Sequence, residues 1–254
     1  MNNPCKLRYC ILGTGVWGSR VKNILLKMDR EVNTIEINRG AINSDYVKKL
    51  TARLENYSSK CDVLWIAIPP IMQYDISLIA TKLGYHQIFE KPWLVSRNKT
   101  NSLISLMKEY KLTASVHYQY CYMGKLPGFA EKISDSQAKL KMRGEFTTSR
   151  GDRLGVSHLD NLGSHLVSIW LYYFPHIDNL YLETNYNSQN KRNIQIYDKE
   201  NNLVDSLDFL FNNEHLVQKY ILDFEASIVD NKQFKLDMVF ASNVKDKIDK
   251  LRNV

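Results

Sequence analysis

A glycine-rich turn near the start of the chain constrains its fold more than any other feature. Residues 7–12 (LRYCIL) read as a short apolar strand, and the segment GTGVWGSRVKNILLK that follows reads as a turn and a helix. Its glycines Gly13, Gly15 and Gly18 are spaced G-x-G-x-x-G. They would permit a tight turn, a close approach of ligand to backbone, and close packing of helix on strand. The alternative is a glycine turn that merely packs.

Further strands and helices alternate after this turn. Strand patterns cover residues 32–37, 61–70 and 86–89, with helix patterns at 44–57 and 74–84 between them. This alternation predicts an α/β class, with a Rossmann dinucleotide-binding domain over residues 1–121. In such a sheet, ligands bind beyond the carboxyl ends of the strands, with the phosphates at the helix N-terminus. The residues expected to contact the dinucleotide are Gly13, Thr14, Gly15, Val16, Trp17, Gly18, Asn38, Arg39, Ile68, Pro69, Pro70, Glu90 and Lys91.

The end of the second strand bears on the choice between NADP(H) and NAD(H). If the strand ends at Ile37, Asn38 and Arg39 lie at its tip, and a guanidinium suits a 2′-phosphate. This placement predicts a preference for NADP(H), with NAD(H) also possible. An end two residues earlier would bring Glu36 to the tip instead, and its carboxylate would favour the ribose hydroxyls of NAD(H).

The segment FEKPW, residues 89–93, comes where the fourth strand of the first domain stops. A lysine at this point can donate a hydrogen bond to a substrate oxygen, or give and take a proton. Pro92 fixes the backbone and can adopt a cis peptide bond, and Glu90 is expected to fix the strand end. The alternative for Lys91 is an ordinary surface lysine at a strand exit.

Three segments in this order, GTGVWGS, DVLWIAIPP and FEKPW, resemble the Gfo/Idh/MocA oxidoreductases, whose members include glucose-fructose oxidoreductase, inositol dehydrogenases and biliverdin reductase. The resemblance continues through TASVHYQYCYMGKL, LDNLGSHLVSIWLYYF and YILDFEASIVDNK, in a chain shorter than the usual member. It implies an NAD(P)-dependent oxidoreductase that transfers a hydride between nicotinamide and a small carbonyl or hydroxyl compound, foremost a sugar or nucleotide sugar. The alternatives are an imine or tetrapyrrole-type reductase, or a non-catalytic dinucleotide-binding regulatory protein.

The remaining residues, 122–254, predict a second domain of the α+β type. Alternating strand patterns at 138–146, 179–186, 193–198 and 205–211 indicate an open, mainly antiparallel sheet with one dry face. In the family this sheet is the usual oligomer interface. We therefore expect a homodimer or homotetramer.

A helix expected over residues 158–173 carries a polar stripe of His158, Asn161, His165 and Ser168. The family places an Asp and a His four residues apart here, facing the substrate; the matching positions are Asn161 and His165. Asp160 is adjacent but would point about 100° away on an ideal helix. The resemblance thus implies Lys91, His165 and Asn161 as catalytic residues.

The substrate site is expected to be lined by Asn161 and His165, together with Tyr118 and Tyr120 at the exit from the first domain. The alternative for both tyrosines is aromatic packing at the domain junction. Lys91 and His165 are expected to meet at the substrate, one from each domain. Arg150 and Arg153 would suit an anionic substrate.

Charge and cysteine usage narrow the partners. The formal charge is +7, but Lys and Arg are scattered among acids, so we expect no nucleic-acid partner. The four cysteines form no CxxC pair and the histidines do not cluster, so no metal site is expected, and ordinary roles are expected for most other histidines. No signal peptide is apparent, and no apolar run approaches the ~20 residues of a membrane span. These features predict a reduced, cytoplasmic protein with a small-molecule substrate.

Overall fold

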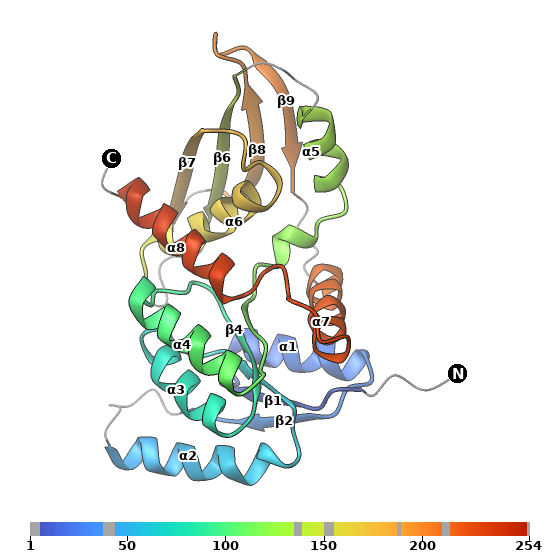
Figure 1. Cartoon of the computed structure of the whole chain (residues 1–254). Helices are drawn as coiled ribbons and strands as arrows, with labels where there is room; N and C mark the ends of the chain where they lie inside the picture. Colours follow the sequence, from blue (N-terminus) through green and yellow to red (C-terminus); the bar gives the residue numbers. More distant parts are fainter. Residues whose placement is uncertain are drawn as a thin grey trace. The chain divides into compact units, whose positions relative to one another are not determined.

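The structure is a computed structural model, which describes residues 6–37, 44–134, 139–149, 155–186, 189–209 and 214–252. The chain forms two compact units (Figure 1). The first unit contains residues 1–117 and 217–242, and the second contains residues 118–216 and 243–254.

The first unit has a five-stranded parallel sheet in the order β2-β1-β3-β4-β5. Its strands are β1 (Tyr9–Leu12), β2 (Val32–Ile35), β3 (Val63–Ile66), β4 (His86–Phe89) and β5 (Ala114–Val116). The helices between them are α1 (Val16–Lys27), α2 (Ser44–Ser58), α3 (Pro70–Lys82) and α4 (Arg97–Glu109). Every residue of β1 and β3 is buried, as expected for parallel strands covered on both faces. The predicted Rossmann-type α/β fold is confirmed.

Two element boundaries differ from the prediction. Strand β2 ends at Ile35 rather than Ile37, so Glu36 is the first residue beyond it. Helix α3 begins at Pro70, not four residues later, with Pro69 as its N-cap. Proline fits the first helical position because the N–H that it lacks would have no intrahelical partner there. The proline pair ends one element and starts the next.

The domain boundary also differs, since the second domain was expected to be the continuous segment 122–254. Residues 118–121 belong to the second unit, and residues 217–242 pack with the first. In helix α7 (Glu214–Val229), Glu225 accepts hydrogen bonds from Tyr9 Oη (2.9 Å) and pairs with Arg30 Nη2 (2.7 Å). Ser115 of β5 accepts from Tyr220 Oη at 2.7 Å. These contacts join residues that are far apart in the sequence. Local strand and helix patterns could not predict them.

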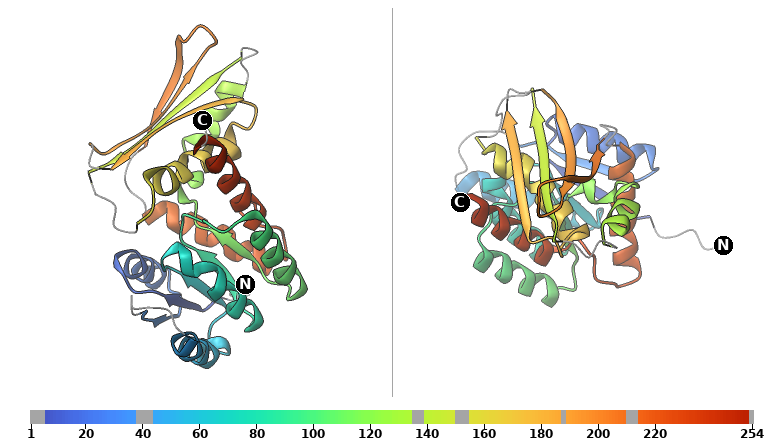
Figure 2. Two further views of the ribbon diagram at one scale, coloured as in Figure 1. Left: turned by 90° about the vertical axis from the view of Figure 1, so that its left-hand side faces the viewer. Right: turned by 90° about the horizontal axis from the view of Figure 1, so that it is seen from above.

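The second unit has a four-stranded sheet in the order β7-β6-β8-β9 (Figure 2). Its strands are β6 (Lys141–Thr148), β7 (Asn179–Tyr186), β8 (Lys191–Tyr197) and β9 (Leu203–Asp208). Two of the three pairings are antiparallel, while β6 and β7 run parallel. The predicted mainly antiparallel sheet is therefore confirmed, with one parallel edge pair. Met142, Ile194 and Ile196 form the buried face, and Lys141 and Arg143 point the other way.

The helical segments of the second unit are η1 (Gln119–Tyr122), α5 (Leu126–Ser134), η2 (Leu159–Gly163) and α6 (Ser164–Tyr173). Helix α8 (Met238–Arg252) starts in the first unit and ends in the second. None of the helices in the described ranges combines the length and the apolar character needed to cross a bilayer.

Candidate functional site

The glycine-rich turn has the geometry that its spacing predicts. Gly13 has a φ of +97°, and a Cβ atom there would lie 2.4 Å from the carbonyl oxygen of Ala67. A Cβ atom on Gly18 would lie 1.9 Å from the carbonyl oxygen of Gly13. Both positions therefore need glycine. Gly13 allows the turn and its close contact with Ala67, which follows β3, and Gly18 allows α1 to pack on the turn.

The outer side of the same turn is open. A Cβ atom on Gly15 would have no neighbour within 4 Å, and Val16, the first residue of α1, is 83% exposed. Gly15 is the N-cap of α1, whose first N–H groups have no partners within the helix. An open backbone beside a helix N-terminus fits the phosphates of a dinucleotide. The turn residues Gly13, Thr14, Gly15, Val16, Trp17 and Gly18 would hold that part of the cofactor.

The residues predicted to select the cofactor lie only partly within the described chain. Asn38 and Arg39 are outside the described residues. Glu36 is exposed directly after β2, and its backbone carbonyl accepts a hydrogen bond from Arg53 Nη1 at 3.0 Å. Arg53 of α2 thus brings a guanidinium to this strand end. The sequence analysis missed it because an exposed arginine within a helix carries no distinctive pattern.

The end of β3 lies against the glycine turn. Ile68 Cγ2 would be 3.2 Å from a Cβ atom on Gly13, and Ile68 itself is buried. Pro69 and Pro70 follow at the start of α3. The structure therefore brings Ile68 together with the turn, as the sequence predicted.

Glu90 is the most heavily bonded residue of the FEKPW segment. Its Oε1 accepts from Trp65 Nε1 (2.9 Å) and lies 3.1 Å from His117 Nδ1. Its backbone N–H donates to Ile66 O (3.0 Å), and its carbonyl accepts from Gln73 Nε2 (2.7 Å). The predicted role of Glu90 in fixing the strand end is confirmed. Its carboxylate contacts are with the buried side chains of Trp65 and His117.

Lys91 follows this anchored residue at the carboxyl end of β4. It is half-buried, and its peptide bond to Pro92 is cis. Strand β4 pairs with β3, and β3 pairs with β1, which leads into the glycine turn. Lys91 and the turn thus lie at the same edge of one sheet, and this is the arrangement that a lysine acting beside a bound nicotinamide requires.

His117, one of the histidines for which the sequence predicted an ordinary role, is fully buried. It follows β5, and its ring lies against those of Trp17, Trp65 and Tyr220, with centroid distances of 6.0, 5.0 and 4.6 Å. The only signal that could have found it is its place at the end of a parallel strand next to β4.

In the second unit, the expected regular helix begins with a π-helical turn, η2. Asn161 lies in this turn, and its Nδ2 donates to Tyr186 Oη at 3.0 Å, while Tyr186 Oη donates to Val156 O at 3.0 Å. His165 lies in the regular helix α6 that follows. The predicted polar stripe is therefore interrupted, since a π-turn holds one more residue than an α-turn. Its members also differ in burial: His158 is exposed, Asn161 half-buried, and His165 and Ser168 buried.

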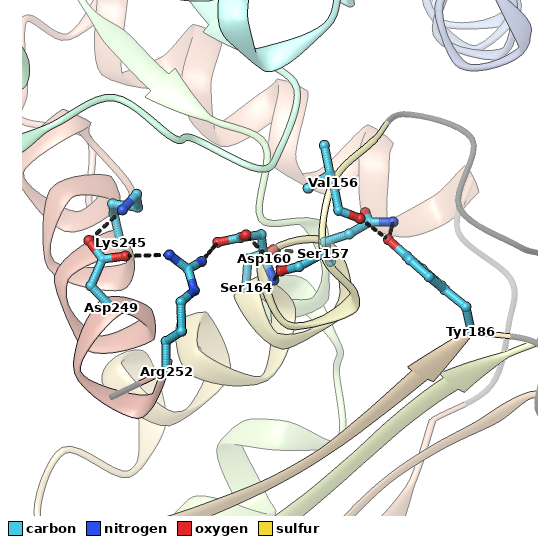
Figure 3. A network of polar contacts seen from close by, with 9 residues as sticks. Val156, Ser157, Asp160, Ser164, Tyr186, Lys245, Asp249 and Arg252 are labelled. Atoms are coloured by element: carbon cyan, nitrogen blue, oxygen red, sulfur yellow. Dashed lines mark hydrogen bonds and ion pairs between the residues drawn. The ribbon is translucent and has the colours of Figure 1, made fainter. Parts of the chain in front are cut away.

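Asp160, the neighbouring acid, has its own partners, Ser157 and Arg252 (Figure 3). Its carboxylate accepts from Ser157 Oγ (2.7 Å) and pairs with Arg252 Nη2 of α8 (2.5 Å). Arg252 also pairs with Asp249, which is bonded to Lys245 (Figure 3). Asp160 therefore joins the π-turn to helix α8.

This contact leads to a stability prediction. Replacing Arg252 with methionine should lower the free energy of unfolding by about 1–2 kcal/mol, because the buried Asp160 carboxylate loses its cation. The loss is smaller than for a fully buried pair because Arg252 is partly exposed to solvent. Urea denaturation measures the change. The matched control is Lys199→Met, whose pair with Glu200 is exposed and should contribute less than ~0.5 kcal/mol. Adding Asp160→Asn should recover most of the loss; no recovery would contradict the ion pair.

His165 lies in an aromatic cluster of the second unit. Its ring is 4.7 Å from that of Tyr120, edge to face, and 6.1 Å from that of Phe146. Tyr118 and Tyr120 are both buried, so the packing role that the sequence left open fits them. The guanidinium of Arg192 lies 5.0 Å from Phe146 and 5.9 Å from Tyr120. Arg192 therefore lies beside this cluster. Arg150 and Arg153, which the sequence suggested for an anionic substrate, are outside the described residues.

Comparison with known proteins identifies the fold. No family model and no curated protein matches the sequence. Solved structures do match. UDP-N-acetylglucosamine 3-dehydrogenase GnnA from Acidithiobacillus ferrooxidans superposes with a TM-score of 0.76 at 13% identity, over 98% of this chain and 97% of that one. The chain shares its two-domain fold.

Two further neighbours have the same fold. The WlbA (WbpB) dehydrogenase from Thermus thermophilus, in complex with NAD and UDP-GlcNAcA, gives a TM-score of 0.74 at 14% identity, over 98% of this chain and 95% of that one. KijD10, a 3-ketoreductase from Actinomadura kijaniata in complex with TDP-benzene and NADP, gives 0.74 at 11% identity, over 97% of each chain. These identities establish the fold and not the activity.

Proposed function

We propose that the protein is an NAD(P)-dependent oxidoreductase that transfers a hydride between the nicotinamide and a carbonyl or hydroxyl group of a sugar or nucleotide sugar. One observation carries this proposal. The glycine turn, whose geometry suits a dinucleotide, and Lys91, which follows the anchored Glu90, both lie at the carboxyl ends of the parallel strands. The fold neighbours support it, since their names describe nucleotide-sugar dehydrogenases and a ketoreductase.

The bound dinucleotide would supply the hydride acceptor or donor, and the chain would manage the proton. Lys91 is the proposed acid–base group, because an ammonium at a strand end can give a proton to a developing alkoxide and take it back in the reverse direction. His165 is proposed to act on the same substrate from the second unit. Asn161 can hold a substrate hydroxyl but cannot carry charge, so it would orient the substrate. Arg192 would suit the anionic part of a nucleotide sugar.

The second candidate is a dinucleotide-binding regulatory protein without turnover. It is favoured by one observation: Asn161 stands at the family's aspartate position, and its amide is bonded to Tyr186. Titrating the protein into NADPH and NADH while following cofactor fluorescence, and then assaying UDP- and TDP-sugars and their keto forms, separates the two. Binding with turnover supports the enzyme, and binding without turnover on any of these compounds supports the regulator. Absence of binding would refute both.

We expect tighter binding of NADP(H) than of NAD(H). Arg39 follows Glu36 by three residues in the sequence, and Arg53 of α2 contacts the Glu36 carbonyl. Either guanidinium would suit a 2′-phosphate. Fluorescence titration should show that Arg39→Ala weakens NADPH binding by about tenfold or more, as one charge-assisted hydrogen bond contributes ~1.5–3 kcal/mol. NADH binding should stay unchanged in that variant. The prediction is wrong if the wild type prefers NADH and Glu36→Gln weakens NADH binding. Glu36 would then bind the ribose hydroxyls of NAD(H).

We also propose that the protein self-associates through the outer face of the second sheet. Along β7 the outward residues are exposed, with Tyr181 at 56%, and Leu203 and Val204 of β9 are exposed as well. Light scattering at micromolar concentration should show a dimer or tetramer. Tyr181→Asp should shift it to the monomer, whereas Tyr110→Asp, which changes an exposed tyrosine of the first unit, should not. A monomeric wild type would contradict this proposal.

A further inference from the structure

The ring of the buried histidine that follows β5 has a hydrogen-bond partner at only one of its two nitrogens among the described residues. His117 is fully buried, and its Nδ1 lies 3.1 Å from Glu90 Oε1. Trp65 Nε1 already donates to that oxygen, so the oxygen acts as an acceptor and the hydrogen between it and His117 belongs to Nδ1. On the other side of the ring, Nε2 has no hydrogen-bond partner among the described residues. The imidazole therefore works through its Nδ1–H group.

Glu90 is held from several directions, and His117, which follows β5, is its side-chain contact on the β5 side. Its backbone is bonded to β3 through Ile66 and to α3 through Gln73, and its carboxylate is bonded to Trp65 and His117. Lys91 follows Glu90 directly, so the direction in which the Lys91 side chain leaves the strand depends on this anchor. The backbone bonds hold the main chain of Glu90, and the carboxylate bonds hold its side chain.

We propose that His117 is a positioning residue for Lys91, acting through a hydrogen bond from Nδ1 to the Glu90 carboxylate. The proposal rests on the proposed function for its catalytic consequence, and on the geometry of the first unit alone for its structural part. In this proposal, the Nδ1–H group of His117 is the fixed donor that orients the Glu90 carboxylate. The oriented Glu90 in turn sets the position of Lys91. All four residues, Trp65, Glu90, Lys91 and His117, belong to the first unit.

The one-sided contacts decide which substitutions to compare. In His117→Asn the amide Nδ2 takes the place of imidazole Nδ1 and can still donate to Glu90, and no bond is lost at the Nε2 side. In His117→Phe the ring remains but the donor is lost. His117→Ala, which removes the donor without adding bulk, gives the same comparison if the phenylalanine variant does not fold.

A matched control lies at the other end of β4. His86 Nδ1 accepts a hydrogen bond from the backbone N–H of Thr113 at 3.0 Å, and His86 is the first residue of the strand whose last residues lead to Glu90. His86→Phe removes a histidine hydrogen bond from the same sheet at the edge away from Lys91. It should lower the melting temperature without altering Lys91.

Two readouts test the proposal, and the first needs no substrate. The labelling rate of Lys91 by acetic anhydride, followed by peptide mass spectrometry, should change by about threefold or more in His117→Phe, because a lysine amine responds readily to its surroundings. It should match the wild type in His117→Asn and in His86→Phe. With a substrate in hand, kcat should fall ~10²-fold in His117→Phe, as expected for a misplaced catalytic group, with the Kd for NADPH unchanged.

The proposal is overturned if His117→Phe or His117→Ala labels Lys91 like the wild type, or if His117→Asn behaves like the phenylalanine variant. It is also overturned if His86→Phe changes Lys91 labelling as much, because the effect would then be one of general stability. A wild type that binds neither NADPH nor NADH would refute the proposed function and leave the labelling comparison fully interpretable.

Discussion

Lys91→Met should lower turnover ~10²–10⁴-fold, the range that a positioned acid–base group contributes. Methionine has a similar length but cannot exchange a proton, so the bound substrate would lack the group that serves its oxygen. The Kd for NADPH should stay close to that of the wild type, because the phosphates are expected at the turn from Gly13 to Gly18. Stopped-flow or steady-state assays on the true substrate, with fluorescence titration of NADPH, measure both quantities.

The control for this variant is Lys99→Met. Lys99 is an exposed lysine of the same unit, and its ammonium lies 5.1 Å from the ring of Tyr74. Its replacement should leave kcat unchanged. His165→Ala should also lower kcat, and more mildly if Lys91 is the principal acid. Near-normal turnover in Lys91→Met would contradict the proposed role of this lysine.

Much of the first unit could be predicted because its signals are local. A buried strand, a G-x-G-x-x-G turn and an amphipathic helix are written into consecutive residues, and the repeated alternation predicts a parallel sheet. The second sheet was predicted for the same reason, from strict alternation along residues 179–186, which matches β7.

The errors arose where long-range contacts decide the structure. The pairing of Arg30 and Tyr9 with Glu225 assigns residues 217–242 to the first unit, and no local pattern announces a contact between residues some two hundred positions apart. The π-turn at Asn161 was missed because helical periodicity extends smoothly across it. The end of β2 at Ile35 depends on pairing with β1, which terminates at Leu12 opposite it.

The candidate site divides in the same way. Lys91 was found because FEKPW is a recognisable segment after a strand. The link from Glu90 to His117 was missed because the two residues follow different strands, and only the pairing of β4 with β5 brings them together. The ion pair of Asp160 with Arg252, near the end of the chain, could not be inferred from the local pattern around Asp160.

Substitutions in the glycine turn should separate folding from cofactor binding. In Gly18→Ala the new Cβ atom would meet the carbonyl oxygen of Gly13 at 1.9 Å, so backbone must move. We expect a loss of about 1–3 kcal/mol in the free energy of unfolding, as for other overpacked sites, together with loss of dinucleotide binding because the turn is displaced. Urea denaturation and fluorescence titration measure the two effects.

Gly15→Ala should affect binding far more than folding. Gly15 has a φ of −62°, which alanine adopts freely, and its Cβ atom would have no protein neighbour within 4 Å. The cost to folding should therefore stay below ~1 kcal/mol, which reflects the weaker N-cap that alanine makes. The methyl group would, however, occupy the side from which the phosphates are expected to approach, so the affinity for NADPH should fall by about tenfold or more, the consequence of ~1.4 kcal/mol of steric cost. If Gly15→Ala binds NADPH like the wild type while Gly18→Ala unfolds, the turn serves packing alone, and the dinucleotide site predicted from its spacing is wrong.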